Sequence, residues 1–223
     1  MILLGLLDTQ NLDSSLDFSL LISGEENERF EKIKNEKTRK QSKFSRLLLS
    51  YMYKRVFHEE MPEIFYGKEG KPYFKNEKCA FSISHDENLV AVALTDEEEL
   101  IGIDLQSSMD DERRKRVEER FLSGVSFPKE NSDIPFDFLL FEACNKEESF
   151  DFRESPFEFS FEKVREKNDF LGKWTTLEAC LKLYGCGFEG LKNVNEYLQK
   201  TKVKTLFFQH GGARFALSVA VCK

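Results

Sequence analysis

The chain has 223 residues, of which 40% are hydrophobic and 33% charged, a composition typical of a soluble globular protein. Its net charge of −7 argues against a general nucleic-acid-binding protein, and no apolar run approaches the roughly 20 residues that a membrane-spanning helix needs. The five cysteines form no C-x-x-C pair, which disfavours a disulfide framework or a zinc site and favours the reducing cytoplasm.

The N-terminal quarter begins with a predicted strand and continues with predicted helix. The apolar run at 1–7 is short, has no basic residue ahead of it and reaches Asp8 at once, so it predicts a buried strand and not a signal peptide. From Gly24 to Phe57, apolar residues recur at helical spacing, which predicts one or two amphipathic helices. The sequence Gly-Lys-Glu-Gly-Lys-Pro at 67–72 is typical of a turn.

Three short apolar runs follow this turn, at 79–84, 89–94 and 100–105. The first alternates as a half-buried strand does, and an acidic turn at 95–99 separates the last two. Together they predict a small antiparallel sheet beside a helix.

The second half begins with a predicted helix at 107–121, in which Ser108 and Asp111 are spaced as a capping box. The segment 129–169 then carries eight phenylalanines among many acids, and we assign it no single form. Docking of a partner's hydrophobic helix there is possible in principle, but packing within the fold is the simpler interpretation.

The clearest helix of the second half is predicted from Gly172 to Tyr184, where Gly185 and Gly187 close it. Two strands are predicted to follow, at 202–208 and 214–222, joined by a glycine-containing turn.

Asp104 is the first candidate for chemistry, because it lies within the apolar sequence Ile-Gly-Ile-Asp-Leu. An ionised carboxylate on a buried strand needs a metal or a cation as its partner. The alternative is an aspartate that ends the strand and caps the helix after it.

The predicted helix near the C-terminus supplies a second candidate group. Trp174, Glu178 and Lys182 are four residues apart and therefore share one helix face. A carboxylate and an ammonium beside an indole suit a metal and a phosphate, although the same spacing also describes an ordinary surface ion pair.

The sequence Phe-Ser-Ile-Ser-His at 81–85 is the third candidate. Ser84 and His85, at the end of a strand, are suited to donating hydrogen bonds to a phosphate. They are a poor nucleophile pair, since neighbouring side chains on a strand point to opposite faces.

The order and spacing of four features resemble the 4′-phosphopantetheinyl transferases, in particular the larger single-chain type that activates peptide and polyketide synthetases. These features are a Gly-Lys-Pro turn at 70–72, Phe-x-Ile-Ser-His at 81–85, Gly-Ile-Asp at 102–104, and Trp-x-x-x-Glu-x-x-x-Lys followed by Gly-x-Gly at 174–187. The resemblance runs from about residue 39 to 187, and the last predicted strand also fits it.

This resemblance implies an α+β fold with two similar halves about a pseudo-two-fold axis, at 1–106 and 107–223, the second carrying the acidic Phe-rich insert near 129–169. Coenzyme A would lie between the halves. The implied activity is the Mg²⁺-dependent transfer of the 4′-phosphopantetheine arm of coenzyme A to a serine of an apo acyl or peptidyl carrier protein, which releases 3′,5′-ADP. We expect a monomeric cytoplasmic enzyme that binds neither nucleic acid nor a membrane.

The resemblance also implies the roles of individual residues. Asp104, Gln106 and Glu178 would bind Mg²⁺, with Glu178 taking the proton of the carrier serine and Lys182 neutralising charge on the phosphates. The residues implied to grip coenzyme A are Arg46, Lys71, Ser84, His85 and Lys182. The basic stretch at 31–46 would serve the same end and help dock an acidic carrier protein.

Three residues depart from the family pattern. Gln106 stands where an acid is usual, Leu177 where a lysine precedes the helix glutamate, and Asp86 where a small residue is common. These departures keep an alternative open: a catalytically impaired homologue that binds coenzyme A or a carrier protein without turnover.

Overall fold

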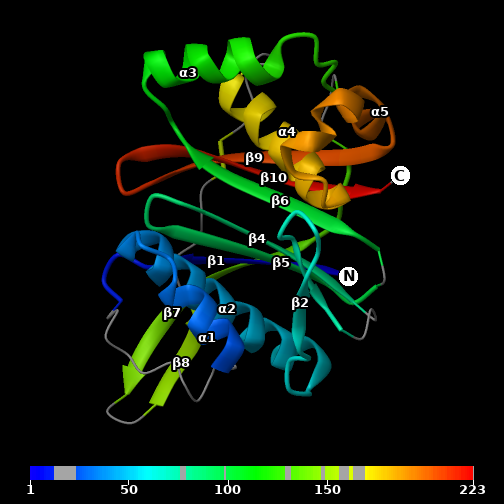
Figure 1. The fold of residues 1–223 in the computed structure, drawn as a ribbon. Coiled ribbons are helices and arrows are strands. Elements are labelled where there is room, and N and C mark those ends of the chain that lie inside the picture. The colour runs from blue at the N-terminus through cyan, green and yellow to red at the C-terminus, as the bar shows by residue number, and fades with distance from the viewer. Residues whose placement is uncertain are drawn as a thin grey trace.

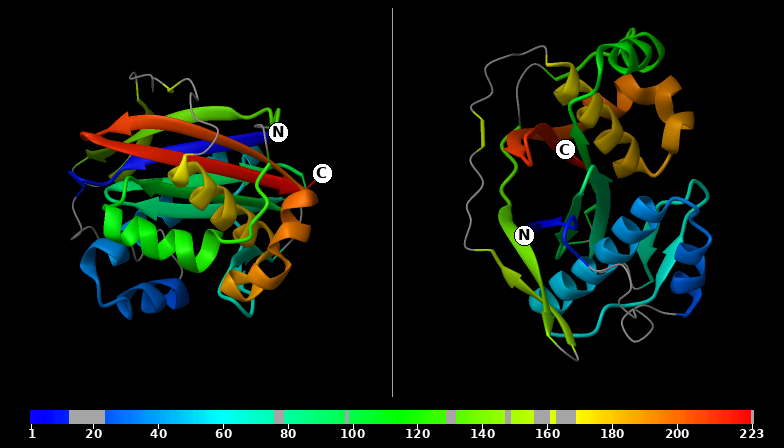
Figure 2. Two further views of the ribbon diagram at one scale, coloured as in Figure 1. Left: turned by 90° about the horizontal axis from the view of Figure 1, so that it is seen from above. Right: turned by 90° about the vertical axis from the view of Figure 1, so that its left-hand side faces the viewer.

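Helices and strands alternate in layers through the protein, as the computed structural model shows (Figures 1 and 2). The structure describes residues 1–12, 24–75, 79–97, 99–128, 132–146, 149–155, 161–162 and 169–222. Two helices cover the outer face of a five-stranded sheet, whose inner face packs on a three-stranded sheet, and the C-terminal helices cover the far side. The predicted α+β class is confirmed.

The five-stranded sheet has the order β4-β5-β1-β7-β8. Its strands are β1 (Ile2–Asp8), β4 (Ala80–Asp86), β5 (Leu89–Thr95), β7 (Asp137–Lys146) and β8 (Ser149–Glu154). The apolar opening run is therefore a strand, as predicted, and it is central: β1 pairs antiparallel with β5 and parallel with β7.

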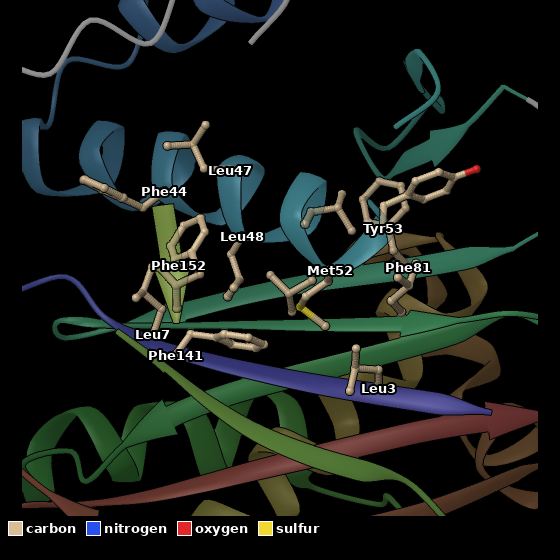
Figure 3. Close-up of a cluster of buried hydrophobic side chains, with 14 of the residues drawn as sticks. Leu3, Leu7, Phe44, Leu47, Leu48, Met52, Tyr53, Phe81, Phe141 and Phe152 are labelled. Carbon is tan, nitrogen blue, oxygen red and sulfur yellow. The ribbon is translucent and has the colours of Figure 1, made fainter. Parts of the chain in front are cut away.

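Helices α1 (Gly24–Glu31) and α2 (Glu36–Phe57) form within the segment predicted to be helical. The side chain of Asn35 caps α2 by accepting a hydrogen bond from Thr38 N at 2.9 Å. The apolar face of α2, including Phe44 and Met52, packs against the sheet in the larger of the buried clusters (Figure 3). The hairpin of β2 (Ile64–Tyr66) and β3 (Pro72–Phe74) then surrounds the predicted turn.

The three-stranded sheet corrects one prediction. The run expected to join β4 and β5 is strand β6 (Ile101–Ser107), and it pairs instead with β10 (Ala213–Cys222), which pairs with β9 (Thr201–His210). Local alternation identifies a strand but not its partner, and β6 buries Ile103 and Leu105 against the inner face of the other sheet.

The helices of the second half follow their predicted positions with shifted ends. They are α3 (Asp111–Val117), a π-helical turn (Glu118–Leu122), α4 (Phe170–Tyr184), a 3₁₀ turn (Gly187–Asn193) and α5 (Val194–Gln199). The predicted capping box is wrong: Asp110 caps α3 by accepting a hydrogen bond from Arg113 N at 2.7 Å, while the Ser108 hydroxyl donates to Arg214 O. Gly185 ends α4 in the left-handed conformation, as expected (φ 62°).

The described part of the Phe-rich segment packs within the fold. It supplies β7 and β8, and both Phe141 and Phe152 are buried under α2. The remainder of 129–169, namely 129–131, 147–148, 156–160 and 163–168, lies outside the described residues.

Strand pairing does not follow the predicted division after Gln106. Strand β6 belongs to the sheet of the C-terminal strands, and β7 returns to the N-terminal sheet. The division into units 1–106 and 107–223, and the pseudo-two-fold axis, stay predictions. No helix within the described ranges is both long and apolar enough to cross a membrane.

Strand β4 is joined to β6 through side chains. Ser82 Oγ accepts from Ile103 N at 3.0 Å, Ser84 Oγ accepts from Leu105 N at 3.1 Å, and Asp86 Oδ2 accepts from Ser107 N at 2.6 Å. Every second residue of β4 therefore satisfies every second backbone N–H of β6, so the edges of the two sheets meet along a polar seam.

Helix α4 lies directly on β6 at Gly102. A Cβ atom at this position would come 2.1 Å from Ala179 O and 2.5 Å from Leu183 N, both of them backbone atoms of α4. Since side chains alternate along a strand, Asp104 and Gln106 face α4 together with Gly102.

We expect Gly102→Ala to lower the free energy of unfolding by about 1–3 kcal/mol or more, because the methyl group must push α4 away from β6. Urea unfolding followed by circular dichroism measures this change. The control is Gly24→Ala at the start of α1, where a Cβ would meet no atom within 4 Å. Equal stability of the two variants would contradict the close contact.

Candidate active site

Asp104 lies at the centre of the candidate site. It is 2% exposed on β6, and its Oδ1 accepts hydrogen bonds from Lys182 Nζ at 2.7 Å and from Ser84 Oγ at 3.0 Å. Its Oδ2 is buried and accepts from no N–H or hydroxyl group in the described part of the chain. One oxygen of this carboxylate is thus fully engaged, and the other has only the carboxyl group of Glu178 as a hydrogen-bond partner.

Glu178 and Lys182 reach Asp104 from adjacent turns of α4, as the predicted helix face requires. Burial raises the pKa of Glu178 to about 8, the negative charge of Asp104 and a hydrogen bond with Asp104 add to the rise, and the positive charge of Lys182 opposes it. Two carboxyl groups therefore lie close together with one ammonium, and at neutral pH Glu178 keeps its proton unless a cation replaces it.

Ser84 is hydrogen-bonded to both Asp104 and Lys182. Its hydroxyl donates to Asp104 Oδ1 and accepts from Leu105 N and from Lys182 Nζ, the latter at 3.0 Å. With 5% exposure and all three bonds internal, Ser84 positions Asp104 and Lys182 in this structure.

Gln106 faces the same side of β6 one pleat further along. Its Nε2 donates to Asp86 Oδ2 at 2.8 Å, and the same oxygen accepts from the backbone N–H and the hydroxyl of Ser107. Two of the three departures from the family pattern, Gln106 and Asp86, are therefore direct partners.

Lys71 joins the β2–β3 hairpin to α4 and β6. Its Nζ donates to Leu183 O at 2.9 Å, near the C-terminus of α4, and to Ile101 O at 3.3 Å. Burial lowers the pKa of Lys71 to about 8, although the thiolates of two nearby cysteines would raise it. The ammonium supports the end of the helix, where the macrodipole favours a positive charge.

His85 lies beside the group without joining its hydrogen bonds, whereas Arg46 makes its contacts elsewhere. Burial lowers the pKa of His85, as does the positive charge of Lys182, so the imidazole is neutral at neutral pH. Arg46 Nε lies 2.9 Å from Glu26 Oε1, and its Nη2 donates to Tyr66 OH at 3.0 Å. Arg46 is thus 4% exposed among α1, α2 and β2.

A pocket of about 290 Å³ lies beside Glu178 and Lys182. Its apolar wall includes Phe81, Ile83 and Phe188, and Lys71 also lines it. The structure therefore brings Lys71, Ser84, Asp104, Glu178 and Lys182 around one place, while Arg46 is not among the residues that line the pocket.

Sequence reasoning missed the pairing of Asp86 with Gln106. A signal for it is present in the polar residues Ser82, Ser84 and Asp86, which recur at every second position of β4. Such alternation indicates a polar face, but it does not say which strand that face meets.

The raised pKa of Glu178 predicts how stability depends on pH. Between its ordinary value of 4.5 and about 8, the folded protein keeps a proton that the unfolded chain has released, so the free energy of unfolding falls as pH rises through this window. Urea unfolding between pH 5 and 8 with a chelator present measures this slope.

We expect Glu178→Gln to flatten the slope, because glutamine does not ionise. The exposed Glu189→Gln variant is the control and keeps the wild-type slope. A Glu178→Gln variant with an unchanged slope would contradict the close approach of the two carboxyl groups.

Comparison with known proteins supports the N-terminal part of the pattern. A family model described as 4′-phosphopantetheinyl transferase, N-terminal, matches residues 12–97. The matched range contains Arg46, Lys71, Ser84 and His85 and ends before Asp104 and Glu178. No curated protein sequence matches the chain.

Proposed function

The match over residues 12–97 places the chain in the 4′-phosphopantetheinyl transferase superfamily, and from this premise we propose that it transfers the 4′-phosphopantetheine arm of coenzyme A to a serine of an apo acyl or peptidyl carrier protein. The co-product is 3′,5′-ADP, and the reaction requires Mg²⁺. We expect the enzyme to act as a monomer in the cytoplasm, and the free thiols of Cys79, Cys180, Cys186 and Cys222 suit a reducing compartment.

The buried pair of carboxyl groups, Asp104 and Glu178, is the observation that carries the proposal. Asp104 Oδ2 is buried and accepts from no N–H or hydroxyl group of the described residues, so it depends on the proton of Glu178 or on a cation. Glu178 lies against it, and burial together with the charge of Asp104 disfavours a second negative charge there. A divalent cation between the two carboxylates would remove both penalties.

The donors fit Mg²⁺ in chemical type. Asp104, Glu178 and the amide oxygen of Gln106 would hold it, since this ion prefers oxygen ligands and keeps several of its waters. When bound, it supplies positive charge to the pyrophosphate of coenzyme A. No cluster of three or more His, Cys, Asp or Glu suited to a metal occurs among the described residues, so the protein would offer two carboxylates and the amide of Gln106, with water and phosphate as the other ligands.

Glu178 is proposed as the general base. Its carboxylate takes the proton of the carrier serine, directly or through one water, and a bound cation would favour this ionised form of Glu178. The serine oxygen then forms a bond to the phosphorus of the phosphopantetheine phosphate, and the bond from that phosphorus to the 3′,5′-ADP oxygen breaks. The electron pair leaves with 3′,5′-ADP.

Lys182 is proposed to stabilise the charge that develops on the leaving phosphate. Its ammonium is fixed by Asp104 and Ser84 and is about one third exposed, so part of it remains accessible from the pocket. Lys71 and His85 are proposed to contact coenzyme A at the edge of the same region, and Ser84 acts by holding Lys182 and Asp104.

Mass spectrometry of an apo acyl carrier protein, incubated with this protein, coenzyme A and Mg²⁺, tests the function. We expect a mass gain equal to one phosphopantetheine arm. The gain should be lost in Glu178→Gln and in Asp104→Asn and kept in the exposed control Glu189→Gln. Wild-type protein that modifies no acyl or peptidyl carrier would contradict the proposal.

One observation favours the alternative of a homologue that binds without turnover. Leu177 is fully buried in an apolar cluster with Trp174 and Leu181. The residue before Glu178 therefore supplies no positively charged side chain to the site. Calorimetry that detects coenzyme A binding, together with no mass gain on any carrier, would establish this alternative.

A further inference from the structure

Asp86 ends β4 beside the end of β6, and its contacts converge on a single oxygen. Oδ2 accepts from Gln106 Nε2 at 2.8 Å, from Ser107 N at 2.6 Å and from the Ser107 hydroxyl. The carboxylate therefore binds the side chain of one β6 residue and the backbone of the next.

The contact with Asp86 fixes which way the Gln106 amide points. An ionised carboxylate only accepts hydrogen bonds, so the amide must turn its nitrogen towards Asp86. The Gln106 oxygen, at the other corner of the planar amide, is then directed away from Asp86. In the described part of the chain, only Asp86 is hydrogen-bonded to this side chain, which is 8% exposed.

The orientation of the Gln106 amide decides whether it offers an oxygen or N–H groups beside Asp104. Gln106 lies two residues after Asp104 on the face of β6 that α4 covers, where the carboxyl groups of Asp104 and Glu178 are buried together. A correctly turned amide adds a third oxygen to those of Asp104 and Glu178. A reversed amide would present N–H groups, which repel a cation.

We propose that Asp86 is a positioning residue for the divalent cation: it holds the Gln106 amide with its oxygen available as a ligand and places a negative charge directly behind that ligand. The inference rests on the proposed function, because it concerns the cation of that reaction. Asp86 acts through Gln106 and does not itself touch the cation.

We expect Asp86→Asn to lose affinity for the divalent cation. Asparagine keeps the shape of the side chain but removes the negative charge behind the Gln106 amide, and its single acceptor oxygen, shared with the two Ser107 donors, holds Gln106 Nε2 less strongly. Partners of metal ligands typically change metal affinity by about 10–100-fold when mutated. We therefore expect Mn²⁺, titrated into protein saturated with coenzyme A and followed by electron paramagnetic resonance of free Mn²⁺, to bind about tenfold or more weakly.

A double-mutant cycle separates positioning from a general effect. In the Gln106→Ala background, Asp86→Asn should change Mn²⁺ affinity by no more than about twofold, because the residue through which Asp86 acts is gone.

Two further variants exclude simpler explanations. Ser107→Ala removes one bond to Asp86 without touching Gln106, so it should lower stability in urea and leave Mn²⁺ affinity within about twofold. Glu87→Gln removes a negative charge one residue away, on a side chain that pairs with Lys37, and should also leave the affinity unchanged.

The outcomes distinguish this inference from the proposed function. Wild-type protein that binds Mn²⁺ while Asp86→Asn binds it equally well would overturn the role of Asp86 and leave the transferase proposal standing. Full additivity in the double-mutant cycle would do the same. Wild-type protein that binds coenzyme A but no Mn²⁺ would overturn the proposed cation site and this inference together.

Discussion

The backbone of helix α4 touches strand β6 at Gly102, where a Cβ atom would lie 2.1 Å from Ala179 O. This contact leaves no room for a side chain, so it fixes the height of α4 above the strand. Asp104 lies two residues further along β6, on the same face, and the side chains of Glu178 and Lys182 extend to it from α4. A charged group buried this deeply needs its partners at hydrogen-bonding distance, and the missing side chain at Gly102 brings them there. The electrostatics of the candidate site thus depend on a packing constraint.

The polar seam between β4 and β6 supports the same group from the opposite side. Ser84 satisfies the backbone of β6 and also binds Asp104 and Lys182, so one hydroxyl both joins the sheets and orders the site. Asp86 does the same at the end of the seam, for Ser107 and Gln106. Because each of these side chains has a structural bond as well as a site bond, a change in one alters both the joining of the sheets and the geometry of the charged residues.

The sequence predicts the local elements well, because their signals are local. The helical spacing within 24–57, the alternation around Ser84 and the glycine that ends α4 each reflect a rule that acts over a few residues. The grouping of Asp104 with Glu178 and Lys182 was implied by the family resemblance, because helix periodicity alone puts only Glu178 and Lys182 on one face. The capping of α3 by Asp110 was missed, because two neighbouring residues fit the signal almost equally.

The pairing of strands that lie far apart in the chain could not be predicted from the sequence. Nothing in Ile101–Ser107 distinguishes β10 from β5 as its neighbour, and the Phe-rich segment gives no sign that β7 runs parallel to β1. The contact of Asp86 with Gln106 depends on the same unpredictable meeting of two sheets. A matching sequence position also does not fix the contacts of a side chain. Arg46 fits the family pattern in sequence, but its guanidinium contacts Glu26 and Tyr66.

The most direct measurement is a crystal structure with coenzyme A and Mn²⁺, located by its anomalous scattering. We expect one peak in contact with Asp104 Oδ2, the Glu178 carboxylate and the Gln106 amide oxygen, with the pyrophosphate completing the coordination. Coenzyme A bound away from these residues, or a peak that contacts neither carboxylate, would contradict this expectation.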